Sequence, residues 1–202
     1  MENAYQPISG LKKSDFQKQI QGKETDLFFL HNANGMEVAI TNYGGALVAI
    51  MVPDRNGNFA NVIQGHDCID DCVASPEPFL STLVGRYGNR ICKGRFQLGG
   101  KVYQLPINDG ENSLHGGNEG FNKKVWDALR MNDETVVLNY VSSYGEEGFS
   151  GEVKVTVTYT FNDDNELIID YMATTNKKTV ICLTNHGFFS LAGIANPTPD
   201  VY

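Results

Sequence analysis

The most regular hydrophobic pattern of the chain lies in residues 152–161, where apolar and polar side chains alternate. The apolar positions are Val153, Val155, Val157, Tyr159 and Phe161. Because successive side chains of a β-strand point to opposite faces, this alternation predicts a strand with one buried face. The polar turn at 162–165 and the apolar run at 166–173 predict its antiparallel hairpin partner.

Shorter segments of the same kind recur between turn residues. We predict further strands at 36–41, 46–52, 95–98, 101–105, 135–141 and 179–183. The polar run 54–58 predicts a turn, and helical periodicity is confined to 14–20 and 67–74. We therefore expect an all-β fold, either a sandwich or a barrel, with residues 1–202 forming a single domain.

The charge balance limits the kinds of molecule that we expect the chain to bind. Sixteen Lys and Arg stand against 24 Asp and Glu, which gives a net charge of -8. Because phosphate backbones and anionic lipids are bound by clustered Lys and Arg, we expect neither nucleic acid nor an anionic membrane as a partner. No apolar run reaches the roughly 18 residues of a membrane helix, so we expect no membrane span.

The N-terminus and the cysteines bear on location and metal binding. The first seven residues carry neither a cationic region nor an apolar segment of the kind found in signal peptides. No two of the four cysteines have the Cys-x-x-Cys spacing, and no histidine pair completes a zinc site. The cysteines are Cys68, Cys72, Cys92 and Cys182. We expect free thiols, no metal and a cytoplasmic location; a periplasmic or secreted location stays open if a signal peptide has been removed.

Two histidines occur in glycine-marked frames. His115 lies in Asn-Ser-Leu-His-Gly-Gly (112–117) and His186 in Leu-Thr-Asn-His-Gly-Phe-Phe (183–189). An imidazole pKa of about 6.5 lets histidine give and take a proton near neutral pH, and glycine lets the backbone approach a ligand closely. The structural alternatives are a buried imidazole bonded to backbone for His186 and a polar loop residue for His115.

The segment 85–91 reads Gly-Arg-Tyr-Gly-Asn-Arg-Ile and places two guanidinium groups beside an amide. A guanidinium suits paired hydroxyls or an anion, although surface salt bridges would use the same residues. The segment lacks the spacing of a phosphate-binding loop. We interpret His31 and His66 as structural or solvated, and Trp126 as a core residue rather than a platform for a sugar.

Taken together, these segments resemble the aldose 1-epimerase (galactose mutarotase) family. Each segment alone is a weak signal, but they occur in family order between residues 36 and 193. They are Thr-Asn-Tyr-Gly-Gly (41–45), Val-Pro-Asp-Arg-Asn-Gly (52–57), 85–91, Leu-Pro-Ile-Asn (105–108), 112–117, Gly-Phe-Asn-Lys (120–123), Gly-Glu-Glu-Gly (145–148) and Leu-Thr-Asn-His (183–186).

The resemblance implies the large antiparallel β-sandwich of mutarotase-like proteins. It also implies interconversion of the α and β anomers of free aldohexoses such as glucose and galactose, without a cofactor or metal. By the same resemblance, His186 is the general acid that protonates the ring oxygen, and His115 binds the sugar near that oxygen. The other positions that match substrate-contacting or site-lining residues are Asn89, Arg90, Gly187 and Phe188. The family commonly has serine and tyrosine at the last two.

The resemblance also implies a glutamate base and a substrate-orienting aspartate from the C-terminal part of a longer chain. The glutamates that do not match the base position are Glu111, Glu119, Glu146 and Glu147. We therefore expect the N-terminal portion of a longer enzyme, with a missing segment, self-association or a partner completing the sheet. The alternative function is a non-catalytic carbohydrate-binding module, in which the same residues only hold a sugar. The absence of the glutamate base favours this alternative, and therefore an inactive protein, for the chain by itself.

Overall fold

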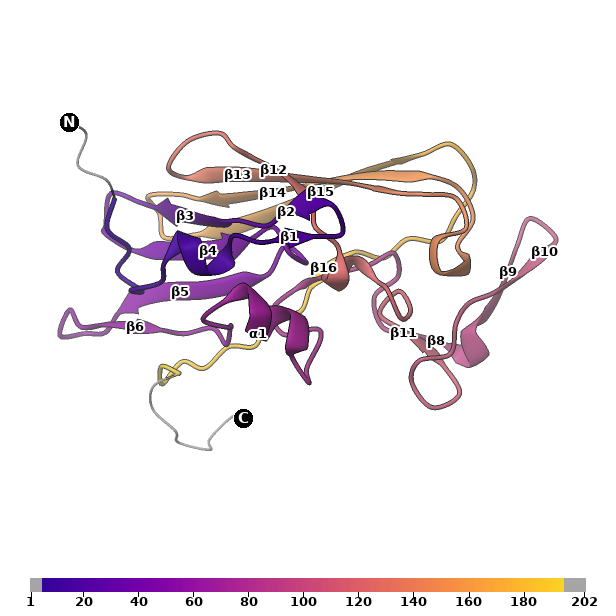
Figure 1. The fold of residues 1–202 in the computed structure, drawn as a ribbon, viewed down its shortest axis with the longest axis horizontal. Coiled ribbons are helices and arrows are strands. Elements are labelled where there is room, and N and C mark those ends of the chain that lie inside the picture. The colour runs from indigo at the N-terminus through magenta and orange to yellow at the C-terminus, as the bar shows by residue number, and fades with distance from the viewer. Residues whose placement is uncertain (1–4, 195–202) are drawn as a thin grey trace.

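The computed structural model describes residues 5–194 and is built around two four-stranded antiparallel sheets (Figure 1). The first sheet consists of β3 (Leu27–His31), β4 (Glu37–Thr41), β5 (Leu47–Pro53) and β6 (Phe59–Asn61). The second consists of β12 (Asp127–Arg130), β13 (Thr135–Ser142), β14 (Val153–Phe161) and β15 (Leu167–Thr175). In both sheets the strands follow chain order, and no ladder between the described strands joins the two sheets. The all-β prediction is confirmed, and its form is a sandwich.

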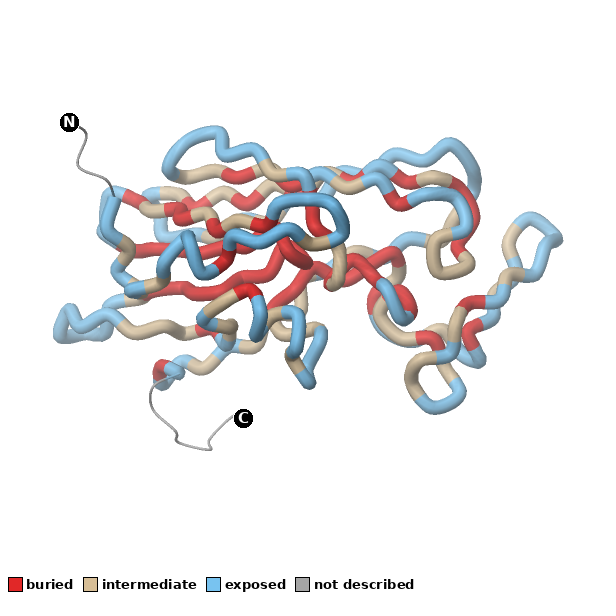
Figure 2. Tube along the Cα trace, in the orientation of Figure 1, coloured by how far each residue is buried: buried red, intermediate tan, exposed pale blue. Residues whose placement is uncertain are grey.

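One apolar core lies between the two sheets (Figure 2). Its members include Leu30, Val38, Ile40 and Leu47 from the first sheet and Leu138, Val155, Val157 and Tyr159 from the second. Burying a side chain of this size contributes about 1.5–3 kcal/mol. The apolar positions of β14 are those that face this core, so the alternation at 152–161 is confirmed as a half-buried strand.

The hairpin that follows β14 also agrees with the sequence pattern. Phe161 pairs with Leu167, and the side-chain oxygen of Asn162 accepts hydrogen bonds from the backbone N–H groups of Asp164 and Glu166 at 3.1 and 2.9 Å. An Asn that bonds the backbone two residues ahead is a common turn device. The β14–β15 register therefore follows from a local turn signal.

The first sheet is covered on both faces, since every residue of β4 is buried. On the side away from the second sheet, a second cluster joins Leu27, Ala39 and Val48 to Phe16 and Ile69. These two residues come from the 3₁₀ turn η1 (Lys13–Phe16) and from α1 (Ile69–Ala74), the helix predicted within 67–74. A strand buried on both faces is apolar throughout rather than alternating, which explains why β3 escaped prediction.

The predicted helix at 14–20 is wrong. Only the single turn η1 forms, and Gln19–Ile20 already begins β1, which pairs with β2 (Lys23–Glu24). The Thr25 hydroxyl donates to the carbonyl oxygens of Phe16 and Lys18 at 2.7 and 3.0 Å. A longer helix would need those carbonyls for its own ladder.

The predicted strand at 179–183 is also wrong. Only Cys182 finds a bridge partner there, because its N–H donates to Arg86 O and its carbonyl accepts from Gly88 N. The ladder begins later, at β16 (Thr184–Asn185), which pairs with β7 (Leu83–Val84). Residues 85–88 carry two glycines and run into the candidate site, so they offer no regular edge to pair with.

The remaining elements form an arm beside the sandwich, drawn at the right of Figure 1. They comprise β8 (Arg90–Ile91) paired with β11 (Ser113–Leu114), the 3₁₀ turn η2 (Cys92–Gly94), and the hairpin of β9 (Arg95–Leu98) and β10 (Lys101–Gln104). Two further 3₁₀ turns lie outside this arm: η3 (Phe121–Lys123), whose Phe121 belongs to the core, and η4 (Glu146–Gly148), between β13 and β14. The predicted strands at 95–98 and 101–105 are thereby confirmed.

An open apolar groove of about 770 Å³ lies between β5 and β15. Ile50, Leu167 and Phe189 line it, and β15 is an edge strand on which Met172 is exposed. Whether a missing segment, a second copy or a partner covers it stays a prediction.

No helix between residues 5 and 194 is long and apolar enough to cross a membrane. The four cysteines are free thiols. Two parts of the sequence interpretation lie outside the described residues: residues 1–4 of the segment examined for a signal peptide, and residues 195–202 at the end of the single domain predicted for 1–202.

Candidate active site

His115 is fixed at the end of β11 by two reciprocal bonds with Asn89. Its Nδ1 accepts the Asn89 N–H at 2.9 Å, and its own N–H donates to Asn89 O at 3.3 Å. Both residues have left-handed backbone, with φ values of 53° and 68°. Because Nδ1 is an acceptor, a neutral His115 carries its proton on Nε2. The ring therefore presents a donor on its other side.

His186 is held by backbone bonds to the strand before the arginine segment. Its N–H donates to Thr82 O at 2.8 Å, and its carbonyl accepts from Ser81 N at 3.1 Å. These bonds continue the β7–β16 pairing by one residue. They fix the backbone of His186 without using its imidazole.

The two imidazoles meet although 71 residues separate them in the sequence (186 - 115 = 71). Their ring centroids are 5.0 Å apart and the rings are nearly perpendicular, at 81°. Both residues are half-buried, so the rings remain within reach of a ligand. The two glycine-marked frames therefore form one site.

The other predicted site residues differ in how closely they lie to this pair and in which of their groups remain free. Asn89 uses its side-chain oxygen to accept from Arg90 N at 2.8 Å, which leaves its amide nitrogen free for a ligand. The exposed Arg90 pairs through Nε with Asp109 Oδ2 at 2.7 Å. Phe188 lies against His186, with ring centroids 5.0 Å apart, and Gly187 connects the two.

The sequence interpretation missed Phe79. Its ring centroid lies 4.6 Å from that of His115 and 6.3 Å from that of His186, so this aromatic ring contacts both histidines. Phe79 stands in a loop without periodicity or a recognisable motif, and no sequence signal pointed to it. Asp109 was missed as well, although the turn at Asp109-Gly110 ends one residue before the His115 frame.

Trp126 and His31 have structural environments apart from the histidine pair. Trp126 is 1% exposed and donates to Phe121 O, which confirms its core role. His31 stacks on Tyr5 at 4.3 Å and lies 3.7 Å from Asp133, which agrees with a structural role. Among residues 5–194 no group of three His, Cys, Asp or Glu side chains could hold a metal ion.

The surroundings of His115 favour its neutral form. Burial lowers the pKa of His115, and the charges of His186 and Arg90 lower it further, whereas Glu77 and Asp109 oppose the shift. A neutral imidazole can donate from Nε2 to a sugar oxygen near pH 7. His115 is therefore suited to act as a hydrogen-bond donor through Nε2.

Acidification is expected to destabilise the fold through His115. Because its pKa is lower in the folded state than the unfolded value of about 6.5, the unfolded state binds more protons as the pH falls through that value. The stability that the neutral His115 contributes to the fold is therefore fully present above about pH 6.5, and it is lost as the pH falls below that value. We expect an NMR titration to place the His115 midpoint below 6.5 or so, and the His115→Asn variant to lose less stability between pH 7 and 5. A midpoint at or above that of free histidine would contradict this account.

Gly116 is expected to tolerate no side chain. Its φ is +92°, and a Cβ there would overlap the carbonyl oxygen of Gly85. We expect Gly116→Ala to cost about 3 kcal/mol or more in urea unfolding, because left-handed strain adds to a backbone clash. The control is Gly110→Ala, at φ +58° with nothing within 4 Å, which should cost about 1–2 kcal/mol. Equal losses in the two variants would rule out the clash.

Comparison with known proteins decides the family. A family model described as aldose 1-epimerase matches residues 26–200. This chain belongs to the aldose 1-epimerase family. Galactose mutarotase from Bos taurus is 41% identical over 169 residues, which is 84% of this chain and 48% of that protein. Aldose 1-epimerase from Escherichia coli K12 is 35% identical over 173 residues, 85% of this chain and 49% of the relative.

Solved structures of the family have the same fold. An aldose epimerase homologue from C. elegans superposes with a TM-score of 0.79 at 31% identity, over 82% of this chain and 51% of that one. Galactose 1-epimerase from Lactobacillus acidophilus gives a TM-score of 0.76 at 29% identity, over 85% and 51%. The mutarotase-like sandwich is thereby confirmed, and the chain spans about half the length of the relatives it matches.

Proposed function

We propose that this chain interconverts the α and β anomers of free aldohexoses, with galactose and glucose as substrates. The observation that carries the proposal is the perpendicular pair of His115 and His186, at 5.0 Å between ring centroids. The names of the relatives support the same chemistry, since they are called galactose mutarotase and aldose 1-epimerase.

Anomer interconversion needs one proton delivered and one removed. Protonation of the ring oxygen lets the C1–O5 bond break while the anomeric hydroxyl loses its proton, which yields the open aldehyde. Reclosure on the other face of the aldehyde returns both protons and gives the other anomer, so nothing is consumed. A single acid that is restored on closure serves both directions.

In the proposed assignment, His186 is the acid and His115 the binding residue. His186 has an imidazole free of backbone bonds and a backbone fixed by Thr82 and Ser81. His115 has its Nδ1 occupied and its Nε2 available to donate. The free amide of Asn89 and the guanidinium of Arg90 would bind sugar hydroxyls, with Phe188 and Gly187 bordering the site.

The base is not assigned among the described residues, because the resemblance gives this role to a glutamate that none of them matches. Solvent water can take the anomeric proton in its place. General acid catalysis by a positioned group alone contributes about 10²–10⁴-fold. The chain is therefore expected to accelerate anomerisation even when water is the base.

Polarimetry of freshly dissolved α-D-galactose tests the proposal. With the folded chain present, at fixed pH and low buffer concentration, we expect the rotation to reach equilibrium faster than it does spontaneously. An unchanged rate together with saturable galactose binding would overturn the proposal for this chain and leave the carbohydrate-binding alternative in its place.

A further inference from the structure

Two of the ordered segments, 105–108 and 145–148, contribute no residue to the histidine pair or to its ring contacts. The structure places one polar side chain from each of them against the loop that carries His115. These side chains are Asn108, half-buried ahead of β11, and Glu147, half-buried in η4. Because β11 lies where the arm meets the sandwich (Figure 1), the two side chains reach one loop from different parts of the fold.

His115 and Gly116 form the middle of a tight turn, which Gly117 closes by donating its N–H to Leu114 O at 3.1 Å. The backbone φ of His115 is 53°, in the left-handed region that a residue with a side chain seldom occupies. Such a conformation persists only where the surrounding contacts fix it. The contacts that fix this turn therefore decide the direction in which the His115 ring leaves the backbone.

Asn108 makes three hydrogen bonds to the backbone of this turn. Its side-chain oxygen accepts the Leu114 N–H at 2.7 Å, and its amide nitrogen donates to the carbonyl oxygens of Leu114 and Gly117 at 3.0 and 2.9 Å. Leu114 and Gly117 are the first and last residues of the turn, so a single amide group spans both of its ends. The side chain thereby fixes the backbone on each side of His115.

Glu147 supports the end of the same turn. Its Oε2 accepts the Asn118 N–H at 2.8 Å, one residue beyond Gly117. A Cβ added at Gly117, where φ is +106°, would overlap that oxygen, so the carboxylate packs directly against the turn. Because η4 connects β13 to β14, this bond ties the loop of His115 to the second sheet. Hydrogen bonds to a charged acceptor are stronger than those between neutral groups.

The ring of His115 depends on this support. Its Nδ1 accepts the Asn89 N–H at 2.9 Å, and its centroid lies 4.6 Å from that of Phe79 and 5.0 Å from that of His186. All of these contacts require the ring direction that the left-handed backbone gives. A turn released from Asn108 would let His115 return to an ordinary φ, and the bond to Asn89 would be lost.

We propose that Asn108 is a positioning residue that holds His115 in the orientation in which it binds the sugar, with Glu147 supporting the same turn. Neither residue touches the substrate, since each acts through the backbone of 114–118. The consequence for sugar binding rests on the proposed function, whereas the hold on the His115 ring does not. The two effects are therefore measured separately.

NMR measures the hold on the ring, as the scalar coupling across the hydrogen bond from the Asn89 N–H to His115 Nδ1, at a pH where His115 is neutral. We expect Asn108→Ala to lose this coupling. The matched control is Asn162→Ala, because the Asn162 side chain also makes three hydrogen bonds, in the turn between β14 and β15. This control should keep the coupling. Retention of the coupling in a folded Asn108→Ala variant, or its loss in both variants, would overturn the proposal.

Further variants keep the proposal testable if Asn108→Ala does not fold. Asn108→Asp keeps the size of the side chain and the acceptor for Leu114 N–H, but it replaces the amide donor by an oxygen. It should lose the coupling, and a folded Asn108→Asp variant that keeps it would contradict the role of Asn108. Glu147→Gln retains an oxygen that can accept from Asn118 and should keep the coupling, whereas Glu147→Ala should weaken it. Equal couplings in these two variants would remove Glu147 from the proposal.

Polarimetry over a range of galactose concentrations measures the consequence for sugar binding. We expect Asn108→Ala to raise KM about tenfold, as the loss of one well-placed hydrogen bond would. The value of kcat should change little, because the backbone of His186 is held by Thr82 and Ser81. Asn162→Ala should leave both constants unchanged. A lower kcat at an unchanged KM would overturn the positioning of a binding residue.

The two measurements also separate this proposal from the proposed function. If the unaltered chain does not accelerate mutarotation, the proposed function fails, and the NMR coupling alone decides whether Asn108 holds His115. If the chain is active and the coupling survives in Asn108→Ala, the proposed function stands and the positioning role of Asn108 fails.

Discussion

Replacing His186 by glutamine is expected to lower the rate of galactose mutarotation catalysed by this chain by a factor of about 10²–10⁴. Glutamine can still donate a hydrogen bond, but it cannot release a proton to the ring oxygen. The backbone bonds of His186 to Thr82 and Ser81 do not involve the side chain, so the loop should keep its position. Polarimetry gives the rate, and circular dichroism confirms that the variant is folded.

The matched control is His31→Gln. His31 is a half-buried histidine on β3 that stacks on Tyr5 and takes no part in the proposed site. We expect its variant to retain the full rate of mutarotation. A folded His186→Gln variant with the rate of the unaltered chain would remove His186 from the role of acid.

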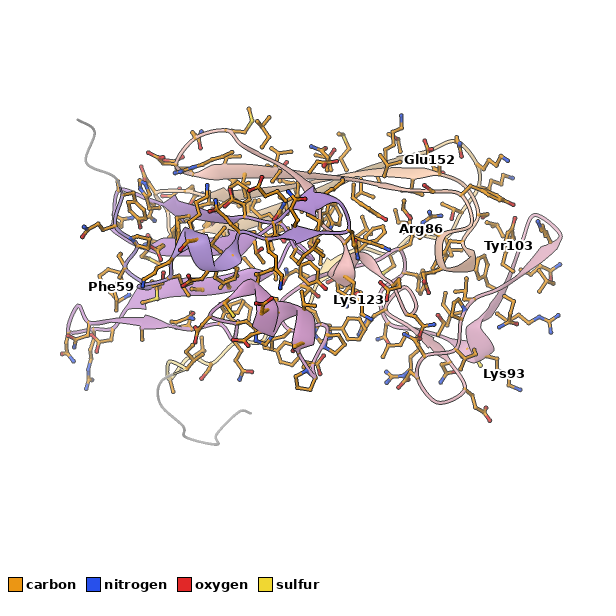
Figure 3. The ribbon with its side chains drawn as sticks, viewed as in Figure 1. Phe59, Arg86, Lys93, Tyr103, Lys123 and Glu152 are labelled. Carbon is orange, nitrogen blue, oxygen red and sulfur yellow. The ribbon has the colours of Figure 1, made fainter. Side chains whose placement is uncertain are left out.

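Arg86→Met is expected to reduce the free energy of unfolding by about 3–5 kcal/mol. Arg86 is 2% exposed, and its guanidinium donates to the carbonyl oxygens of Ser150 and Gly151 at 2.8 and 2.9 Å and to Ser142 Oγ at 2.6 Å. Figure 3 shows Arg86 within the molecule, near the end of the sheet that carries Glu152. Methionine fills part of the space but leaves these acceptors unpaired.

The charge of Arg86 has a nearby partner. The Ser142 hydroxyl donates a hydrogen bond to Glu146 Oε1 at 2.6 Å, and Glu146 Oε2 accepts another from the Tyr140 hydroxyl at 2.5 Å. Removing the guanidinium would leave Glu146 half-buried without the opposite charge, which adds to the expected loss. The segment that Arg86 anchors is the one that carries Asn89 and Arg90 into the candidate site.

Urea unfolding measures the effect, and Arg90→Met is the matched control. Arg90 lies four residues further along the same segment, with its side chain 55% exposed and paired with Asp109. Exposed pairs contribute about 0–1 kcal/mol, so this variant should unfold nearly as the unaltered chain does. Similar losses for the two variants would show that the Arg86 network adds little to stability.

Much of the fold was predictable where a local rule decided it. Alternation predicted β14, and an Asn-rich turn predicted its hairpin partner β15. The prediction failed where long-range contacts overrode local preference. Thr25 ends the helical pattern at 14–20 after one turn, and the strand β3 lies between two covered faces and shows no alternation.

The residues of the candidate site were also predictable only in part. The glycine-marked frames indicated His115 and His186, and the order of motifs indicated the family, because both depend on residues close together in the sequence. The contact of Phe79 with both rings did not follow from any motif. It depends on where a loop without a sequence signal lies in the fold.

Alternation, turn chemistry and the order of motifs are local properties, and they were enough to predict the strand-rich fold, the family and the two histidines. The 5.0 Å separation of the two imidazoles, and the burial of Arg86 beside an exposed Arg90, depend instead on how distant segments pack together. The two arginines stand four residues apart in one segment, and no pattern separates them. Their difference arises because the fold places the carbonyls of Ser150 and Gly151 beside Arg86 alone.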